Sequence, residues 1–520
     1  MSDARRPRLK VRNATFQDID AIIALSVRVY GEDHGYTPDM VRGHLAHFPE
    51  GQFVAVLDEE VVGYCATFRL SEAIAMAPHT WTEITAGGYA SRHEPQGEWL
   101  YGMEVCVDPE RRRIRIGQRL YDARKKLCQR LGLSGIVFGG RMPGYGRREK
   151  QFESAEAYAR AVEAAAVRDP TLSFQLRNGF NLLGVLKGYL PTDRESRGYS
   201  AHLVWHNPKF GSDAVVRQQV RSGGVPETVR VAVIQYQQRR VVSFEQFCEY
   251  VEYFIDVVAD YRSDFAVLPE LLTLQLLSAS PSTLSASESV DLLTTYTPRL
   301  RELLSGLAVR YNVNIVGGSH ITRIEDGSVR NVCYVCLRDG SIHAREKIHP
   351  TPSERSFWGV VGGSEAEAVL TDCGPVGVMI CYDSEFPELA RHLVDQGALM
   401  LFVPFCTDER HGYCRVRYAC HARAIENQCY VAMSGNVGNL PNVHNMDIQY
   451  AESCILTPCD FYFARDGVAA DTTPNTEMVA FANLHLDDLI AARTSGTVLN
   501  LRDRRFDLYQ TRWRGPRRSG

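Results

Sequence analysis

Cys381 follows the apolar run VGVMI at 376–380, which is preceded by Gly374 and Pro375. A run of this length, rich in branched residues and preceded by turn formers, predicts a buried strand. Open α/β sheets carry their chemistry at the carboxyl ends of strands. A free thiol is mostly protonated at neutral pH, so a nucleophilic cysteine needs a base or a nearby cation. Cys381 is therefore a candidate nucleophile, and its partners must come from elsewhere in the chain.

Three ionisable residues upstream could supply those partners. Glu270 ends the short apolar run FAVLP at 265–269 and could accept the thiol proton. Lys347 could stabilise both the thiolate and the negative oxygen that develops on an attacked carbonyl. Glu354, seven residues further on, could hold the lysine or assist proton transfer to an amine leaving group. Each residue also has an ordinary structural interpretation, because a buried cysteine is usually an inert packing residue and a lone lysine usually lies on the surface.

The order of these four residues resembles the nitrilase superfamily of carbon–nitrogen hydrolases. The likeness covers about residues 228–500, and its segments are all in register. They are VAVIQ at 231–235, VLPE at 267–270, GGS at 317–319, KIHPTPSE at 347–354, GVMICYDSEFPE at 377–388, FVPF at 402–405 and ARAIENQCYV at 422–431.

The resemblance implies an α/β fold, here a four-layer α-β-β-α sandwich, and a Glu-Lys-Cys triad. Glu270 would be the base, Lys347 the oxyanion partner, and Cys381 the nucleophile that forms a thioester acyl-enzyme without a cofactor. Glu354 matches the second glutamate of the family, and the backbone N–H of Tyr382 would complete the oxyanion site. The sequence motif C-Y-D-x-x-F-P resembles that of the amidase branches of the superfamily, so we expect a small amide as substrate in preference to a nitrile.

The first 200 residues belong to a different domain. A chain of 520 residues is too long for one ordinary core. Turn formers cluster at 207–227, which marks a boundary. We therefore expect an N-terminal domain at 8–207, a linker at 208–227 and a hydrolase domain at 228–505.

A predicted strand at 103–107 runs through a basic turn into a predicted helix. The unpaired N–H groups and the dipole of a helix start favour a bound phosphate. This region resembles motif A of the GNAT acetyltransferases, V-x-P-x-x-R-x-x-G-x-G, which cradles the pyrophosphate of coenzyme A. The matching residues are Val107, Pro109, Arg112 and Gly117. Arg115 stands where the first glycine of the family belongs, and a side chain there could block close approach of the backbone.

The GNAT resemblance covers about residues 8–205 and implies an α/β domain that binds acetyl-CoA or another acyl-CoA at 107–120. The candidate contacts are Val107, Arg112, Arg113, Arg115, Gly117 and Gln118. The segment FQLRNGF at 174–180 resembles F-Y-x-x-x-G-F, with Gln175 in place of the tyrosine that the family often uses as general acid. Glu104 is a candidate base for acetyl transfer. The departures at Arg115 and Gln175 nevertheless predict weak or absent transfer.

Other interpretations of the N-terminal domain stay open. It could be a true acetyltransferase coupled to the hydrolase, or a sensor or docking module without catalysis, and its arginine cluster could simply be a solvated helix start. Nucleic-acid binding is not expected, because Lys+Arg number 58 against Asp+Glu 62, a net charge of −4. No apolar run is long enough to span a bilayer, and the polar N-terminus lacks a signal-peptide core, so a cytoplasmic location is expected.

The 14 cysteines are expected to be reduced in that location. Cys333 and Cys336 form a C-x-x-C, but they lie in a strand-like run, where a spacing of three points them to opposite faces. No metal site is expected, because the remaining cysteines and histidines lack paired ligand spacing. Self-association is expected through the hydrolase domain, where a helix at 385–394 carries Phe386, Leu389 and Leu393. Those side chains could equally belong to the core.

Overall fold

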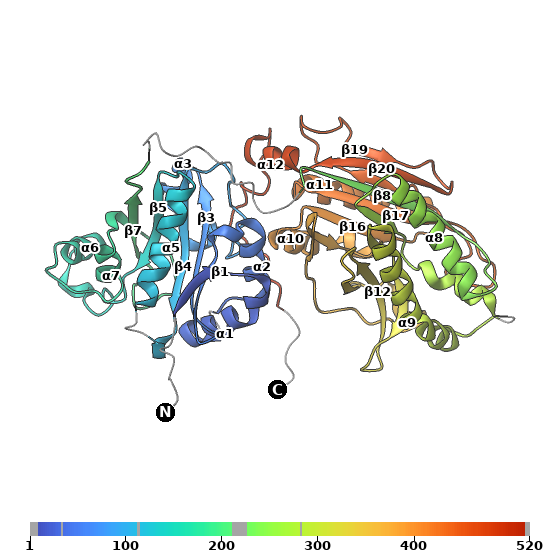
Figure 1. The fold of residues 1–520 in the computed structure, drawn as a ribbon, viewed down its shortest axis with the longest axis horizontal. Coiled ribbons are helices and arrows are strands. Elements are labelled where there is room, and N and C mark those ends of the chain that lie inside the picture. The colour runs from blue at the N-terminus through green and yellow to red at the C-terminus, as the bar shows by residue number, and fades with distance from the viewer. Residues whose placement is uncertain (1–8, 33–34, 112–114, 211–225, 281–282, 515–520) are drawn as a thin grey trace, which may run out of the picture. The chain divides into compact units, whose positions relative to one another are not determined.

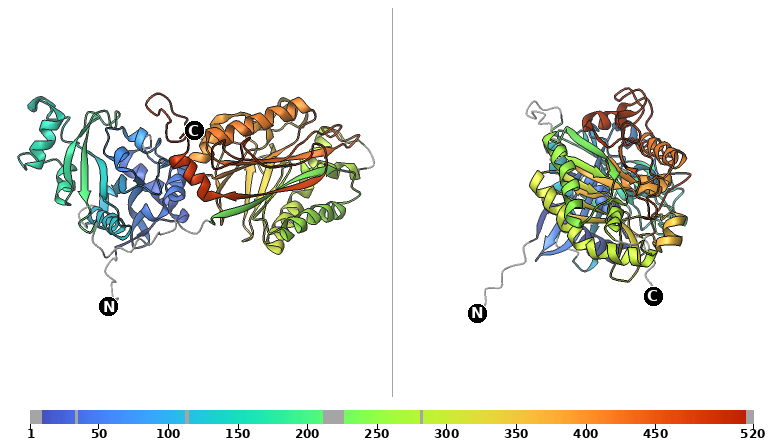
Figure 2. Two further views of the ribbon diagram at one scale, coloured as in Figure 1. Left: turned by 90° about the horizontal axis from the view of Figure 1, so that it is seen from above. Right: turned by 90° about the vertical axis from the view of Figure 1, so that its right-hand side faces the viewer.

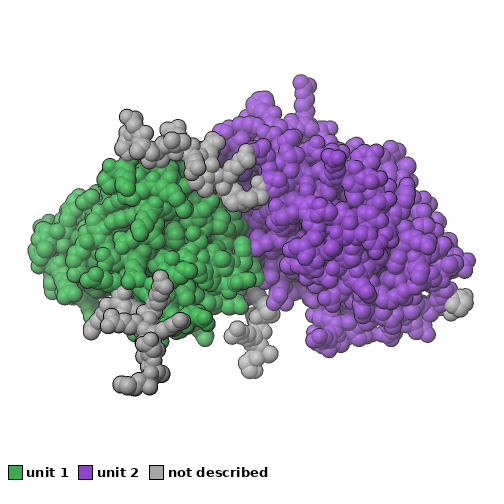
Figure 3. Space-filling view, viewed as in Figure 1, with its two compact units in different colours: residues 1–224, 505–510 green, residues 225–504, 511–520 purple. Residues whose placement is uncertain are grey.

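A computed structural model describes residues 9–32, 35–111, 115–210, 226–280 and 283–514 (Figure 1). The chain forms two compact units, residues 1–224 with 505–510 and residues 225–504 with 511–520, which Figure 3 colours separately. Most of the linker expected at 208–227 lies outside the described residues.

The first unit is built on a mixed sheet with strand order β1-β2-β3-β4-β5-β7-β6. Its strands are β1 Lys10–Asn13, β2 Phe53–Leu57, β3 Glu60–Leu70, β4 Trp99–Val107, β5 Gly135–Arg141, β6 Asn181–Leu186 and β7 Ser200–His206. Its α-helices are α1 Ile19–Tyr30, α2 Pro38–His47, α3 Glu72–Ala75, α4 Trp81–Ile84, α5 Ile116–Arg130, α6 Ala155–Glu163 and α7 Leu172–Arg177.

Helices cover both faces of this sheet, as β3 shows. A Cβ on Gly63 would lie 2.7 Å from Ile116 of α5, so α5 packs against the face that carries Gly63. The ring of the next residue, Tyr64, stacks on His44 of α2. Because successive strand residues point to opposite faces, α2 and α5 lie on opposite sides of the sheet.

The parallel strands β4 and β5 pair at their starts, where Trp99–Tyr101 lie beside Gly135–Val137. Strand β4 then continues to Val107, and a 3₁₀ turn at Pro109–Arg111 leads on towards α5. The register of β3 and β4 also shifts between Ala66 and Thr67. These irregularities concentrate near Glu104, the candidate base.

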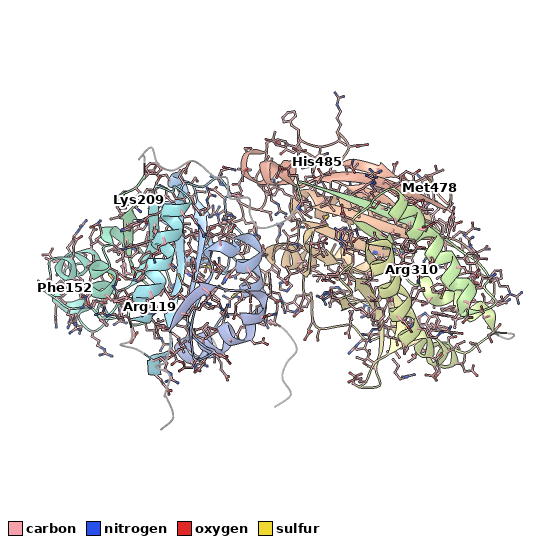
Figure 4. The ribbon with its side chains drawn as sticks, in the orientation of Figure 1. Arg119, Phe152, Lys209, Arg310, Met478 and His485 are labelled. Atoms are coloured by element: carbon pink, nitrogen blue, oxygen red, sulfur yellow. The ribbon has the colours of Figure 1, made fainter. Side chains whose placement is uncertain are left out.

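The second unit contains a sheet in two halves that meet where β8 pairs with β17. One half consists of β8 Thr228–Gln238, β9 Phe265–Leu268, β10 Asn314–Gly317, β11 His320–Arg323, β12 Val329–Cys336, β13 Ile342–Glu346 and β20 Met478–His485. The other consists of β14 Val369–Thr371, β15 Gly374–Val378, β16 Met400–Phe405, β17 Tyr430–Gly438, β18 Cys454–Leu456 and β19 Val468–Asp471. Figure 4 labels both ends of β20, Met478 and His485.

Alternating side chains of β8 separate two cores. Val229, Val231 and Val233 face the second half of the sheet, and Ala232, Ile234 and Tyr236 face the helices α8 (Phe244–Asp260) and α9 (Ala286–Tyr311). Phe265 of β9 contacts Phe402 of β16 at a ring distance of 4.9 Å, so the two halves pack face to face.

Helices α10 (Pro387–Asp395) and α11 (Arg410–Glu426) cover the outer face of the second half, and α12 spans Leu486–Ser495. The left view of Figure 2 shows α11 (orange) and α8 (green) on opposite sides of the strands. This confirms the expected four-layer α-β-β-α sandwich.

The structure shows the surroundings of the cysteines and of the leucines of α10. Cys333 belongs to the core between the sheets and Cys336 to the core under α9, so the two thiols do face opposite ways. All 14 cysteines lie in the described residues and are free. Leu389 and Leu393 are buried in the unit's own core, so they are unavailable as an exposed contact face. No described helix is long and apolar enough to cross a membrane.

Candidate active site

The acidic, basic and thiol candidates of the second unit each follow a strand. Glu270 comes two residues after β9, Lys347 directly after β13, and Cys381 three residues after β15. Cys381 and Leu271, the residue after Glu270, both have left-handed backbones, with φ of 50° and 57°. Such angles are rare for residues with a Cβ and are found where the surrounding structure enforces them. The chain thus turns sharply at both chemical groups.

Lys347 is held between two carboxylates. Its Nζ donates to Glu270 Oε1 at 2.8 Å and to Glu354 Oε2 at 2.6 Å. All three side chains are buried, with exposed fractions of 1%, 2% and 4% for Lys347, Glu270 and Glu354. A buried cation with two carboxylates is tolerated because charge-assisted hydrogen bonds compensate for its lost hydration. The structure therefore brings these three predicted residues together.

Asn331 of β12 also binds the two carboxylates. The sequence analysis did not identify this residue. Its Nδ2 donates to Glu270 Oε1 at 3.1 Å and to Glu354 Oε1 at 2.8 Å. Its carbonyl oxygen accepts from the Lys347 backbone N–H at 2.9 Å. The sequence feature that could have revealed it is an asparagine in the largely apolar strand segment VRNVCYV at 329–335. This strand pairs with β13, which leads directly to Lys347.

Burial and mutual charge set the protonation states of the group. Burial raises the pKa of Glu270, against the effect of the Lys347 cation. Burial alone would lower the pKa of Lys347, but the two carboxylates outweigh it and the pKa lies well above its ordinary value. Burial opposes ionisation of Glu354 as well, yet Lys347 and the Thr351 and Asn331 donors hold its pKa below the ordinary value. Glu270 is accordingly the more basic carboxylate.

Cys381 is the first residue of a 3₁₀ turn, Cys381–Glu385. Its side chain is a protonated thiol rather than a thiolate. Burial raises its pKa well above the ordinary value, and the Glu270 charge adds to this more than Lys347 offsets. The thiol lies within hydrogen-bonding reach of the Glu270 carboxylate, whose pKa it lowers. The Sγ atom also lies 3.8 Å from the Cys406 carbonyl oxygen. A reaction at this sulfur would require removal of its proton, and the Glu270 carboxylate is a base within reach.

Asp383 ties the lysine segment to the cysteine turn. Its carboxylate accepts from the backbone N–H of Ile380 at 3.1 Å and of His349 at 2.8 Å, and lies 2.9 Å from His349 Nδ1. The His349 ring also stacks on Phe386 with ring centroids 3.7 Å apart. This buried carboxylate therefore fixes Cys381 relative to Lys347. Tyr382, the proposed oxyanion donor, follows Cys381 in the same turn and contacts the edge of Phe386.

A cavity of about 540 Å³ lies beside the helical turn at Glu354–Trp358. Phe357 of that turn forms part of its wall and stacks on His444 with ring centroids 3.5 Å apart. The cavity wall consists of Leu277, Thr283, Leu284, Ser285, Ala286, Ser289, Phe357, Asn442, Val443, His444 and Asp447. The catalytic candidates themselves do not line it.

In the first unit the expected coenzyme A turn lies between β4 and α5. Arg115 is the N-cap residue of α5 and has a left-handed backbone, with φ of 62°. Glycine adopts this conformation most easily, so Arg115 takes the backbone conformation that favours glycine. Gly117 follows in the first turn of α5, where a Cβ would lie 3.2 Å from the Phe174 ring and 3.8 Å from Val107. The two segments that resemble GNAT motifs therefore pack on each other at this glycine.

The other predicted contacts of that turn divide into two groups. Arg112 and Arg113 lie outside the described residues. Gln118 is exposed, as is its neighbour Arg119, which Figure 4 labels and which donates to the Leu9 carbonyl at 2.9 Å. Gln175 is buried and lies 3.5 Å from the Tyr121 hydroxyl.

Glu104 on β4 has the surroundings of a tuned carboxyl group. It accepts from the Tyr30 hydroxyl at 2.8 Å and from the Tyr36 hydroxyl at 3.2 Å. Burial raises its pKa, and the two hydroxyl groups partly offset this. Arg124 of α5, a residue that sequence reasoning missed, donates to the Glu104 carbonyl at 2.7 Å and to the Ala66 carbonyl at 3.0 Å. Arg124 thereby fixes the irregular stretch of β3 and β4.

Within the described ranges no group of three or more histidine, cysteine, aspartate or glutamate side chains is placed to hold a metal ion. The candidate group of the second unit consists of one thiol, two carboxylates and a lysine.

Family comparisons assign the two units separately. The model of the carbon-nitrogen hydrolase family matches residues 230–494, and that of the acetyltransferase (GNAT) family matches residues 19–143. Among solved structures, Nit3 from Saccharomyces cerevisiae, a member of branch 10 of the nitrilase superfamily, aligns with a TM-score of 0.44 and 22% identity over 52% of this chain and 95% of that one.

Relatives cover the whole chain and its parts. The probable hydrolase YhcX of Bacillus subtilis is 44% identical over 507 residues, 98% of each chain. The uncharacterized N-acetyltransferase YkwB of the same organism is 30% identical over 38% of this chain and 89% of its own length. The chloroplastic omega-amidase of Arabidopsis thaliana is 31% identical over 40% of this chain and 55% of its own length. The chain thus belongs to the carbon-nitrogen hydrolase family and carries an N-terminal domain of the GNAT acetyltransferase family.

Proposed function

We propose that the second unit hydrolyses a small amide through a thioester acyl-enzyme. The observation that carries this proposal is the buried lysine held between two carboxylates beside a buried thiol. Glu270 would accept the Cys381 proton while the sulfur attacks the amide carbon. Lys347 and the Tyr382 N–H would stabilise the resulting oxyanion. Glu354 would steer the proton to the leaving amine, so that the C–N bond breaks and the acyl group remains on sulfur.

Hydrolysis of the thioester would complete the cycle. Glu270, again unprotonated, would take a proton from water while the hydroxide adds to the acyl carbon. Collapse of that intermediate releases the carboxylic acid and restores the Cys381 thiol. Amides are favoured over nitriles because a departing amine needs the proton that Glu354 helps to deliver. The omega-amidase relative supports the same choice.

Cys381→Ala tests the nucleophile. Hydrolysis should fall by several orders of magnitude, because the covalent route disappears. Ammonia release is measured over a panel of ω-amides, carbamoyl compounds and nitriles, with Cys459→Ala, an exposed cysteine, as the matched control. A folded Cys381→Ala variant with near-normal turnover contradicts the assignment, and faster ammonia release from nitriles than from any amide contradicts the substrate class.

We propose further that the first unit binds coenzyme A or an acyl-CoA at 107–120, with weak or absent acetyl transfer. Support comes from the start of α5 beside the tight approach of Phe174 to Gly117. Weak transfer is expected because Gln175 occupies the position of the family's tyrosine. The second candidate, a bifunctional acetyltransferase and hydrolase, is favoured by the raised pKa of Glu104 among two tyrosines.

Calorimetry with acetyl-CoA separates these roles. Arg112→Ala should weaken binding by roughly 10-fold or more, since a charge-assisted phosphate contact contributes about 1.5–3 kcal/mol. No binding at millimolar acetyl-CoA leaves only a structural or docking role, and an unchanged affinity in Arg112→Ala places the ligand elsewhere. Turnover of acetyl-CoA with an amine panel distinguishes the bifunctional enzyme from the sensor.

A further inference from the structure

Two chain segments that carry catalytic candidates also supply walls of the cavity of about 540 Å³. Leu277 lies on the 3₁₀ segment that begins two residues after Glu270. Phe357 lies three residues after Glu354, on the same helical turn. Short stretches of backbone therefore join the cavity wall to both carboxylates that hold Lys347.

A third wall comes from the loop between β17 and β18, which reaches the thiol by two contacts. Residues within 442–447 of this loop form part of the lining. Gln449 of the same loop accepts a hydrogen bond from Cys406 Sγ at 2.8 Å. The Cys406 carbonyl oxygen in turn lies 3.8 Å from Cys381 Sγ. The cavity is thus built by segments that either carry or contact the candidate catalytic group.

The lining of the cavity is suited to an apolar group. Leu277 and Val443 are buried in the core beneath α8 and α9, and Ala286 adds a methyl group from the start of α9. Phe357 contributes an aromatic ring that stacks on His444. Cavities of roughly 300–1,000 Å³ with linings of this kind bind organic molecules. There is accordingly room for a ring or an alkyl chain attached to an amide.

The polar groups of the lining are few, and one of them is buried. Ser289, in the first turn of α9, is 4% exposed, and among the described residues its hydroxyl group makes no hydrogen bond. It offers one donor and an acceptor to a ligand. The acidic side chain of the lining is the exposed Asp447, and the described lining residues include no lysine or arginine. A carboxylate in the cavity would therefore meet a like charge and no cation.

We propose that this cavity binds the end of the substrate's acyl group that lies away from the scissile C–N bond, and that it selects an uncharged apolar group over a carboxylate. The inference rests on the proposed amide hydrolysis and adds its substrate class. That class is the carboxamides of aryl-alkyl or alkyl acids, as opposed to monoamides of dicarboxylic acids. Burial of the apolar group against Leu277, Val443 and Phe357 stabilises the complex.

Three amides with the same scissile group test the substrate class. They are propanamide, which has no remote group, 4-phenylbutanamide, and glutaramate, the monoamide of glutaric acid. Ammonia release by the full-length protein should give a kcat/KM for 4-phenylbutanamide about 10-fold or more above that for glutaramate, with the difference mainly in KM. A kcat/KM for glutaramate that equals or exceeds that for 4-phenylbutanamide overturns the proposal.

Ala286→Trp fills the cavity from the start of α9, because Ala286 is a half-buried residue of its lining. The variant should lower kcat/KM for 4-phenylbutanamide about 10-fold or more and leave that for propanamide unchanged, since only the longer amide needs the space. Ser287→Trp is the matched control, because the adjacent Ser287 is exposed and does not line the cavity. An equal loss for both amides, or no loss, contradicts the proposal.

Asp447→Lys tests the charge of the cavity at an exposed position, where the fold should tolerate the change. A cation at the rim should raise kcat/KM for glutaramate relative to 4-phenylbutanamide by about 5-fold or more. Glu302→Lys makes the same change of charge at an exposed residue of α9 about 20 Å beyond Ser289. This control should leave the ratio unchanged, and an unchanged ratio in Asp447→Lys as well would count against the cavity.

Calorimetry on Cys381→Ala separates this inference from the proposed hydrolysis. The variant should bind 4-phenylbutanamide more tightly than propanamide, and adding Ala286→Trp should abolish the difference. Hydrolysis of propanamide by the wild type without discrimination between the two longer amides overturns the role of the cavity and leaves the amidase function standing. No hydrolysis of any amide, together with binding of 4-phenylbutanamide that Ala286→Trp abolishes, overturns the hydrolysis and retains the cavity as a binding site.

Discussion

At the scale of single residues, the site depends on how two carboxylates share one cation and one amide. Lys347, directly after β13, and Asn331, on β12, each donate to both Glu270 and Glu354. Without such donors two buried carboxylates would repel each other and at least one would take up a proton. Asn331 is therefore expected to stabilise the ionised pair of carboxylates. It is not expected to take a direct part in the reaction.

Asn331→Ala tests that expectation. Loss of its hydrogen bond to Glu270 should raise the pKa of that carboxyl further, so the acid limb of the pH–rate profile for amide hydrolysis should move to higher pH. Activity at neutral pH should fall about 10- to 100-fold, the equivalent of the 1.5–3 kcal/mol of a charge-assisted hydrogen bond. Asn483→Ala, an exposed asparagine on β20, serves as control. A lower activity with an unmoved acid limb would show that Asn331 acts only on stability.

The sequence named the main residues of the candidate hydrolase site, which the structure brings together, but it did not reveal the residues that support them. Glu270, Lys347, Glu354 and Cys381 stand in recognisable segments of the chain. Asn331 acts through contacts between strand segments, and Arg124 acts through contacts between a helix and two strands. A local sequence pattern does not predict which residues such side chains contact. Arg115 illustrates the converse case, because the departure from glycine was visible but the left-handed backbone that it adopts was not.

At the scale of elements, strands and long helices follow from their apolar periodicity. The alternation along β8 separates two cores, and the alanine-rich segment at 154–166 contains α6, capped by Ser154. The helical turn at 354–358 and the register shift near Ala66 could not be predicted in this way. Both depend on tertiary contacts rather than on local propensity.

Gly102 of β4 is expected to be required by the helix beside it. A Cβ at this position would lie 2.5 Å from Arg124 Nη1, which would push the guanidinium group away from the Ala66 and Glu104 carbonyls. Gly102→Ala should therefore destabilise the first unit by about 1–3 kcal/mol, as overpacking does. Gly184→Ala on β6 is the control, because a Cβ there meets nothing within 4 Å. Equal unfolding temperatures for the two variants would contradict this account of Arg124.

At the scale of the whole molecule, the chain joins a carbon-nitrogen hydrolase domain to a GNAT-family domain, and residues 505–510 return to the first unit. We propose the amidase reaction for the second unit and the acyl-CoA site for the first, each with its own chemistry. Arg112→Ala should accordingly leave amide hydrolysis unchanged while it weakens acetyl-CoA binding. A parallel loss of both activities, measured on the same preparation, would show that the two sites are coupled.

Self-association through the hydrolase domain is a further expectation at this scale. Leu389 and Leu393 are buried in the unit's own core, so any contact must use other side chains, such as the exposed Tyr418 of α11. Light scattering at micromolar concentration should give the mass of an oligomer, and Tyr418→Asp should lower it. A monomeric wild type would exclude association of this kind.

The central claim, a thioester on Cys381, is tested most directly by mass spectrometry of the protein quenched in acid during turnover of an amide from the panel. The account predicts a mass increase equal to the acyl group of that amide, located on the peptide that contains Cys381 and absent from Cys381→Ala. An acyl group on another residue, or rapid hydrolysis by Cys381→Ala, would contradict it.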